Sequence, residues 1–190
     1  MRYWWANQAH AYGVETAGGY LWSRQRRADG TRNPFYDSVR LTQPGDVVFA
    51  YCRGEIRAVG MVLSPARASP APRPLPRQPA DEAAAGWLID VAWIELKRPL
   101  RPSSFMSILA PVLPDVHAPL TPRGRGIQGG RLLELPVRLA RVLLQLAGGT
   151  DPRHVLNPDW VPEQLSFGFG EGNGPRPPGA GETGAAGAGP

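Results

Sequence analysis

The sequence of 190 residues has one cysteine, Cys52, and one lysine, Lys97. A single cysteine excludes an intramolecular disulfide, and no CxxC pair or Cys/His cluster is present to hold zinc. No run approaches the roughly 20 apolar residues of a membrane span, and residues 1–12 lack the apolar part of a signal peptide. We therefore expect a cytoplasmic protein that makes no use of a membrane, a metal or a cofactor.

Positive charge comes almost entirely from arginine. The formal net charge is +5 and the sequence pI is near 10.0. Arginine is suited to bidentate contacts with phosphates and base edges, so the composition is compatible with nucleic-acid binding. A GC-rich genome, which the abundant alanine, glycine and proline also indicate, explains the same composition equally well.

Two low-complexity stretches fall outside any core. Residues 64–86 are rich in proline and alanine without periodicity, and residues 167–190 consist largely of glycine, proline and alanine. We interpret the first as a long exposed loop and the second as a disordered tail. The sequence thus predicts one domain over residues 1–166, followed by the tail.

Short strand patterns dominate the rest of the chain. Strands are predicted at 2–8, 46–52, 55–63, 87–96 and 130–135. A helix with apolar spacing is predicted from Pro136 to the pair Gly148 and Gly149, and a short one at 103–109 with Ser103 as N-cap. No alternating βαβ pattern appears, so we expect an α+β fold built on a strongly bent sheet or small barrel.

Aromatic residues gather near the amino end. Ten of the sixteen lie in the first 51 positions. In the first strand, Trp5 and Asn7 share one face while Gln8 ends the other, so each face ends in an amide beside aromatic rings. Reading a flipped-out base requires such stacking surfaces together with hydrogen bonds to the base edge.

The segment 18–36 reads as a loop by its glycine, aspartate and proline content. It carries four aromatic residues and four arginines, a mixture expected of a loop that contacts a flipped base or a single strand. In the alternative interpretation, the segment is a solvated loop and Trp22 anchors it to the protein. A second basic, glycine-rich loop at 121–130 contains Arg123 and Arg125.

Several segments in joint order resemble a known family. The first strand RYWWANQ, the segments GGYLWS and DGTRNPFYDSVRLTQPGDVVFAY, the strand EIRAVGMV and the loop LTPRGRGIQGG are similar to the EVE domain. This domain is a PUA-like relative of the YTH and ASCH domains. The resemblance covers residues 1–146 and is greatest to the modified-DNA-reading module of EVE-HNH restriction endonucleases.

The resemblance implies a PUA-like bent mixed sheet or barrel with short flanking helices. Its pocket would accept a modified base extruded from DNA, such as 5-methyl- or 5-hydroxymethylcytosine. The base-pocket positions implied are Trp5, Asn7, Gln8, Trp22, Ser23, Asn33, Phe35 and Tyr36, and those near the strand backbone are Arg24, Arg26, Arg123 and Arg125. No HNH-like cluster follows the domain, so we expect a reader without catalytic activity, acting alone or with a separate nuclease or effector.

Three other functions fit the sequence. The same aromatic pocket would suit a PUA-like domain that recognises single-stranded or modified RNA. An enzyme would need a reactive pair, for which Cys52 with His10 or Asp46 with Glu55 are the candidates, although their spacing gives no support. An interaction adaptor would bind its partner through the proline-rich loop and the tail.

Overall fold

The computed structural model describes residues 1–9, 11–27, 29–73, 75, 85–127, 131–149 and 151–153. The chain divides into two units, Met1–Trp160 and Val161–Pro190. The second unit, and with it the predicted tail, lies outside the described residues. The fold below is that of the first unit.

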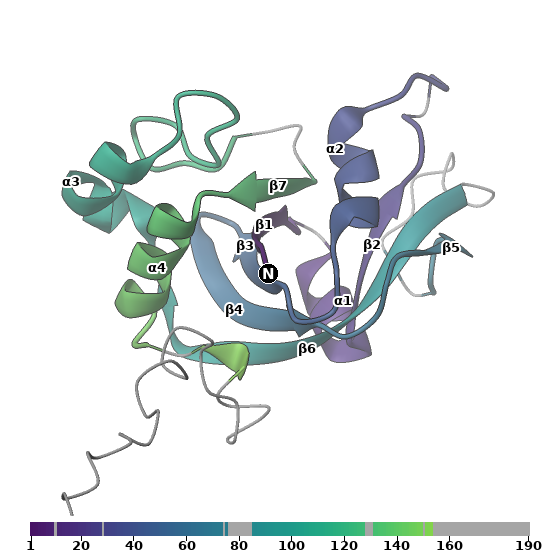
Figure 1. Cartoon of the computed structure of the whole chain (residues 1–190), viewed down its shortest axis with the longest axis horizontal. Coiled ribbons are helices and arrows are strands. Elements are labelled where there is room, and N and C mark those ends of the chain that lie inside the picture. The colour runs from purple at the N-terminus through teal and green to yellow at the C-terminus, as the bar shows by residue number, and fades with distance from the viewer. Residues whose placement is uncertain are drawn as a thin grey trace, which may run out of the picture. The chain divides into compact units, whose positions relative to one another are not determined.

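A mixed sheet forms the centre of this unit (Figure 1). Its order is β2-β6-β4-β3-β1-β7, with β5 also paired to β6. β1 runs parallel to β3, and every other pair is antiparallel. The strands are β1 (Tyr3–Asn7), β2 (Tyr20–Arg24), β3 (Val47–Cys52), β4 (Glu55–Val62), β5 (Arg67–Pro70), β6 (Ala85–Leu100) and β7 (Leu132–Leu135).

Short helices flank the sheet. They are α1 (Tyr12–Gly18), α2 (Pro34–Asp37), η1 (Ser38–Leu41), η3 (Pro102–Phe105), α3 (Met106–Leu109), η4 (Ala110–Val112) and α4 (Val137–Leu146). β4 and β6 curve strongly (Figure 1), and register shifts interrupt both the β3–β4 and the β4–β6 ladders. Such irregularities increase the local bend of a strand, so they help the sheet to curl.

The two faces of β1 supply two separate cores. Tyr3 and Trp5 point into a cluster that also contains apolar residues of α4, while Trp4 and Ala6 point into a cluster shared with Leu21. Alternation along the strand produces this division, because successive side chains leave on opposite faces. β1 is therefore buried on both sides, and its carboxyl end is the part that reaches the surface.

Most of the predicted elements are confirmed. Strands occur close to all five predicted positions, and β6 extends well beyond 87–96. α4 begins after Pro136 and ends before Gly148 and Gly149, both of which have positive φ. The predicted N-cap at Ser103 is wrong, because η3 begins at Pro102 after Arg101 and has no side-chain cap.

Two predicted loops contain strands instead. β2 lies inside the segment 18–36 and pairs residue by residue with β6 from Asp90 to Gly86, and β5 lies inside 64–86 and pairs with the same part of β6. Sheet partners decide strand formation more than local composition does. The helix α1 was not expected either.

Tyr12 connects α1 to the sheet, because its hydroxyl donates to Glu95 Oε1 at 3.2 Å. Burial, and next the nearby Glu95 carboxylate, raise the pKa of Tyr12 to about 12. The unfolded chain should lose this proton near pH 10. The contribution of Tyr12 to stability should therefore be present below pH 10 and be lost as the pH rises from about 10 to about 12.

This shift can be measured by ultraviolet titration of the tyrosines. Tyr12→Phe should remove one phenolate transition near pH 12 and leave the transitions at lower pH in place. If the variant instead loses a transition near pH 10, the contact with Glu95 does not persist in solution.

Candidate nucleic-acid interface

A pocket of about 320 Å³ opens at the carboxyl end of β1. This volume lies at the lower end of the range for small-molecule sites, about 300–1,000 Å³. The lining combines an amide, an aromatic ring, an arginine and exposed backbone. Its residues are Asn7, Ala9, Tyr51, Arg53, Gly54, Gly126 and Ile127.

Asn7 is held from two directions. Its Nδ2 donates to the Ile127 carbonyl at 3.0 Å, and its Oδ1 accepts from Trp5 Nε1 at 3.3 Å. These bonds fix which end of the amide is the carbonyl.

Tyr51 forms the aromatic wall. Its ring lies 4.7 Å from that of Trp5, centroid to centroid, with a tilt of 32°. Its hydroxyl accepts a hydrogen bond from the Gly126 amide at 2.8 Å, so the basic loop passes directly over the ring. A Cβ at position 126 would lie 2.3 Å from the Tyr51 ring, which explains the glycine in this loop.

Beneath the other face of β1 lies a buried ion pair between Glu15 of α1 and Arg131, just before β7. Arg131 also donates to the Asn7 carbonyl at 2.6 Å and, through Nε, to the Trp22 carbonyl at 3.1 Å. Glu15 accepts from the Trp22 amide at 2.9 Å and from Gln8 Nε2 at 3.1 Å. One ion pair therefore joins the carboxyl end of β1, the middle of β2 and the start of β7.

Gln8 belongs to this buried network. Its Oε1 is buried and has no hydrogen-bond partner among the residues that the structure describes. Glu15 accepts a hydrogen bond from the Gln8 amide nitrogen, so the Gln8 amide oxygen points away from Glu15. The sequence predicted Gln8 as a base-contacting residue, but its side chain is only 1% exposed.

The predicted pocket residues do not all line the pocket at the end of β1. Trp5 has no exposed surface and packs in the core, and Trp22 is 7% exposed in a different cluster, with its Nε1 donating to the Ser69 carbonyl at 3.2 Å. In this structure neither ring offers a face to a base. Ser23 is also buried, and Asn33 caps α2 by accepting from the Phe35 amide at 3.1 Å. Of the eight predicted positions, only Asn7 lines the pocket at the end of β1.

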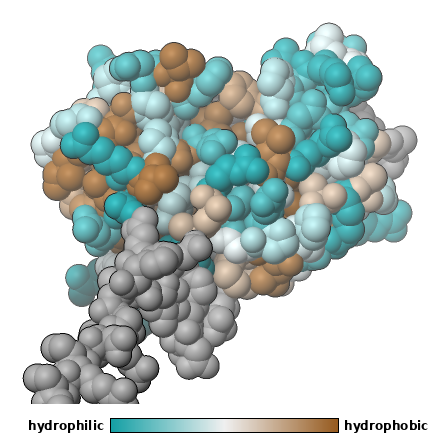
Figure 2. Space-filling model, in the orientation of Figure 1, coloured by the Kyte–Doolittle hydropathy of each residue, from teal (hydrophilic) through white to brown (hydrophobic). Residues whose placement is uncertain are grey.

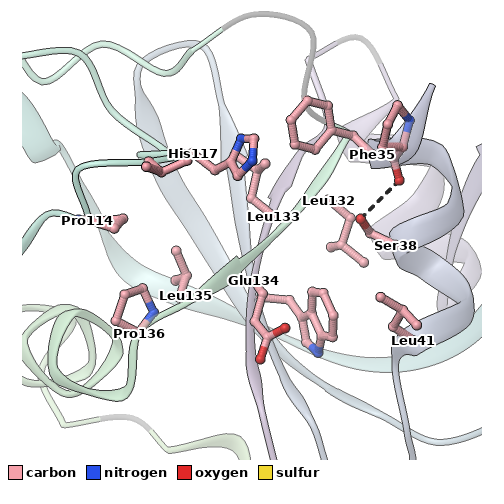
Figure 3. Close-up of a pocket in the computed structure, with 13 residues that line it drawn as sticks. Phe35, Ser38, Leu41, Pro114, His117, Leu132, Leu133, Glu134, Leu135 and Pro136 are labelled. Atoms are coloured by element: carbon pink, nitrogen blue, oxygen red, sulfur yellow. Dashed lines mark hydrogen bonds between the residues drawn. The ribbon is translucent and has the colours of Figure 1, made fainter.

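Phe35 lines a second, larger groove (Figure 3). Its ring meets His117 edge to face with centroids 5.4 Å apart. Tyr36, on the same helix, is partly exposed and lines neither concavity. Neither ring of α2 therefore lines the pocket that contains Asn7.

The candidate arginines lie on several segments. Arg123 and Arg125 are exposed on the loop that crosses Tyr51, and Arg53 lines the pocket itself. Arg26 follows β2, where it forms an isolated bridge with Arg32 and donates to the Gly30 carbonyl at 3.0 Å. Arg24, at the end of β2, is half-buried.

Four functional candidates were missed in the sequence. Tyr51 is a buried residue near the end of β3, which reads as ordinary core, and Arg53 is an exposed residue just after it. Nothing local marks either of them as a pocket residue. Glu15 lies on a helix that was not expected. Arg131 carries no signal beyond following the basic loop.

The proposed reactive pairs find no support in the geometry. Cys52 donates its thiol to the Ala9 carbonyl at 3.1 Å, and burial raises the pKa of the thiol, whereas His10 lies outside the described residues. Asp46 lies at the opposite end of the β3–β4 hairpin from Glu55. Asp46 accepts from Trp4 Nε1 at 2.9 Å, and hydrogen bonds from Arg101 lower the pKa of Glu55.

Within the described part of the chain, no group of three or more His, Cys, Asp or Glu side chains is arranged to hold a metal ion. The helices found there are all too short or too polar to span a membrane.

No protein-family model matches the sequence, and no curated protein matches it. Solved structures do resemble it. The Pho92 YTH domain in complex with m6A has a TM-score of 0.51 at 12% identity, covering 79% of this chain and 87% of that chain. A hypothetical protein from Leishmania major has a TM-score of 0.50 at 10% identity, and the match covers 78% of this chain and 96% of that chain. The human THYN1 protein in complex with 5-methylcytosine containing DNA has a TM-score of 0.49 at 14% identity, covering 80% and 100%.

At these identities the likeness concerns the fold. The curled mixed sheet with short flanking helices is the architecture expected of the PUA-like group to which YTH domains belong. The chain is therefore an α+β protein with a PUA-like fold.

Proposed function

We propose that this protein reads a modified base in a nucleic acid. The observation that carries the proposal is the pocket at the end of β1, where Asn7, Tyr51 and Arg53 converge beneath a loop with two exposed arginines. The shared fold supports it, because the Pho92 YTH domain was solved in complex with m6A. We further propose that the chain binds without catalysis and leaves any cleavage to a separate effector.

In this proposal the base enters the pocket lined by Tyr51 and its edge meets Asn7. Tyr51 is itself only 8% exposed, so stacking on its ring requires the loop at Gly126 to move away from it. Extrusion of a base costs a few kcal/mol, and stacking on an aromatic ring returns about 1–3 kcal/mol. One ring wall therefore offsets extrusion only in part, and arginine contacts to the phosphates must supply the rest. A methyl group adds about 0.8 kcal/mol when buried, roughly a fourfold preference. Selectivity should be weaker than affinity.

Two base classes have specific support. The sequence resemblance to EVE domains favours 5-methyl- or 5-hydroxymethylcytosine in DNA. The fold likeness to a YTH domain in complex with m6A favours N6-methyladenine. DNA and RNA oligonucleotides with the same modified base separate the two polymers, since a site that uses the 2′-hydroxyl loses affinity for DNA.

Fluorescence anisotropy with oligonucleotides carrying cytosine, methylcytosine, hydroxymethylcytosine, adenine and N6-methyladenine tests the proposal. Base reading should appear as an affinity difference between modified and plain bases that persists when the salt concentration is raised. The oligonucleotides should remain full length after incubation with the protein and Mg²⁺. Equal affinity for all of them, at both salt concentrations, would refute base reading.

Asn7→Ala should abolish the preference for the modified base, because it removes the amide from the pocket and releases the Ile127 carbonyl. Asn33→Ala is the matched control. Loss of that N-cap should cost about 1 kcal/mol of folding free energy and leave the preference intact. The reverse pattern, with Asn33 essential and Asn7 dispensable, would place the base near α2 instead.

Arg123→Ala combined with Arg125→Ala should weaken binding to modified and plain oligonucleotides alike. If each arginine contacts one phosphate, the slope of log K against log salt should become shallower by about 1.8 on duplex DNA. The control removes the same charge from α4, as Arg138→Ala with Arg141→Ala, and should leave the slope unchanged. Equal slopes for both double variants would mean that the loop does not contact the strand.

A further inference from the structure

The backbone is strained at the rim of the pocket at the end of β1. Three non-glycine residues in the described chain have a positive φ, and two of them, Ala9 at 36° and Arg53 at 51°, line this pocket. L residues rarely adopt this conformation, because Cβ then approaches the following carbonyl oxygen. Residues held in such conformations cluster at binding sites. The strain therefore points to a role for these two positions in the pocket.

Ala9 and Arg53 occupy equivalent places on neighbouring strands. Asn7 lies opposite Tyr51 in the parallel pair of β1 and β3, and each strained residue follows this pair by two positions. The Cys52 thiol donates to the Ala9 carbonyl at 3.1 Å, which connects the two segments. Both residues thus belong to one part of the rim, at the carboxyl ends of the two strands.

Arg53 lies in a turn that favours other residues. Arg53 and Gly54 form the two-residue loop between β3 and β4, since Cys52 lies opposite Glu55 in the register. The φ angles of Arg53 and Gly54, 51° and 90°, are both positive, as in a type I′ turn. Such turns favour asparagine, aspartate or glycine at the first of these positions. An arginine there lowers the stability of the fold, and nothing in the turn requires it.

The charge of Arg53 is not neutralised within the described part of the chain. Its side chain is exposed and forms no hydrogen bond or ion pair with the residues described there. The neighbouring Glu55 already accepts from Arg57 at 3.3 Å and from Arg101 at 2.8 Å. Arg53 is also the one charged side chain among the described residues that line the pocket. The turn therefore presents a free guanidinium at the rim.

Positive charge borders the pocket on two segments. Arg53 belongs to the β3–β4 turn, whereas Gly126 and Ile127 belong to the loop that carries Arg123 and Arg125. An extruded nucleotide stays attached to its strand through a phosphate on each side. Two basic segments at the rim match these two phosphates.

We propose that Arg53 contacts a phosphate next to the extruded base, while the basic loop contacts the strand on the other side. This inference rests on the proposed function, because it takes the pocket as the site of the base. The planar guanidinium suits bidentate binding of a phosphate. The exposure of Arg53 favours a phosphate, which stays in water, over a base edge inside the pocket. The strain at position 53 is then the cost of placing a guanidinium at the rim.

Arg53→Asn tests the proposal, because asparagine suits the turn and removes the charge. On duplex DNA at 0.1 M salt, its affinity for modified and plain oligonucleotides should fall by about eightfold, and the slope of log K against log salt should become shallower by about 0.9. The ratio of the two affinities should stay as in the parent. The melting temperature should rise by about 2–4 °C as the strain is relieved.

Two variants serve as controls. Arg53→Lys keeps both the charge and the strained turn, so the salt slope and the melting temperature should match those of the parent. Arg138→Asn removes the same charge from α4, which follows the end of β7 that pairs with Tyr3, away from Asn7. Figure 2 shows hydrophilic and apolar residues mixed on the surface at α4. This variant should leave the slope unchanged and should not raise the melting temperature.

The possible outcomes separate this inference from the proposed function. An unchanged salt slope in Arg53→Asn would overturn the phosphate contact, and so would loss of the preference for the modified base at an unchanged slope. A lower melting temperature would show that arginine stabilises the turn and would contradict the strain. Equal affinity of the parent for modified and plain oligonucleotides would refute base reading alone, because a shallower slope in Arg53→Asn would still identify the phosphate contact. A parent that binds neither oligonucleotide would overturn both.

Discussion

Arg131→Ala should lower the free energy of unfolding by about 3–5 kcal/mol, because it leaves Glu15 as a buried charge without its partner. The Glu15 side chain has no exposed surface, so water cannot replace the guanidinium. The same substitution removes the donors to the Asn7 and Trp22 carbonyls. Urea denaturation followed by circular dichroism measures the loss.

Arg101→Ala is the control for this prediction. Arg101 also pairs with a glutamate, Glu55 Oε1 at 2.8 Å, but its own side chain is 64% exposed. Exposed pairs contribute about 0–1 kcal/mol, so this variant should be close to the parent. Similar losses for both arginines would show that Glu15 is accessible to water in solution.

Trp22→Ala should cost about 3–5 kcal/mol, the range for removal of a large buried aromatic side chain. The indole packs with Leu75 and Leu88, and it covers Gly86 so closely that a Cβ there would lie 2.1 Å from Nε1. Thermal or urea unfolding should show this loss. Wherever the variant remains folded, its preference for a modified base should be unchanged.

This outcome separates packing from base reading. Trp87→Ala removes a neighbouring ring of β6 that is only partly buried and should cost less than Trp22→Ala. If Trp22→Ala instead keeps its stability but loses the preference for the modified base, the ring leaves the core to stack on a base. The pocket would then include β2, as the sequence motifs imply.

The two large effects have a common structural basis. Glu15 and Arg131 join three chain segments, of which β1 ends at the candidate site and β2 carries Trp22. Replacing a buried ion pair by apolar residues often costs nothing, so its presence here is weak evidence for stability as such. What the pair fixes is position, because its hydrogen bonds hold the Asn7 backbone relative to β2.

The local sequence pattern was sufficient to predict the strands that lie in the core. Aromatic and β-branched residues occupy both faces, or alternate positions, of β1, β3 and β4. These patterns predict a strand whatever its partners in the sheet are. β2 and β5 could not be found this way. Their residues read as loop, and they become strands because the long strand β6 offers them a partner.

The candidate site shows the same division. Asn7 was predicted, since alternation along β1 puts an amide at the end of an aromatic face. Trp22 was assigned to a pocket because an aromatic residue among arginines resembles a stacking group. Composition could not reveal that residues 69 and 75, distant in sequence, would bond to its indole and cover its ring.

The sequence by itself determined the class of fold, the central strands, the concentration of arginine and the family to which its motifs are similar. These properties depend on residue type and on local spacing, both of which can be read directly from the sequence. Only the tertiary structure decided which aromatic rings fill the core and which arginine borders a pocket. Burial and pairing depend on contacts between residues far apart in sequence, and one side chain can serve as core or as surface depending on what packs over it.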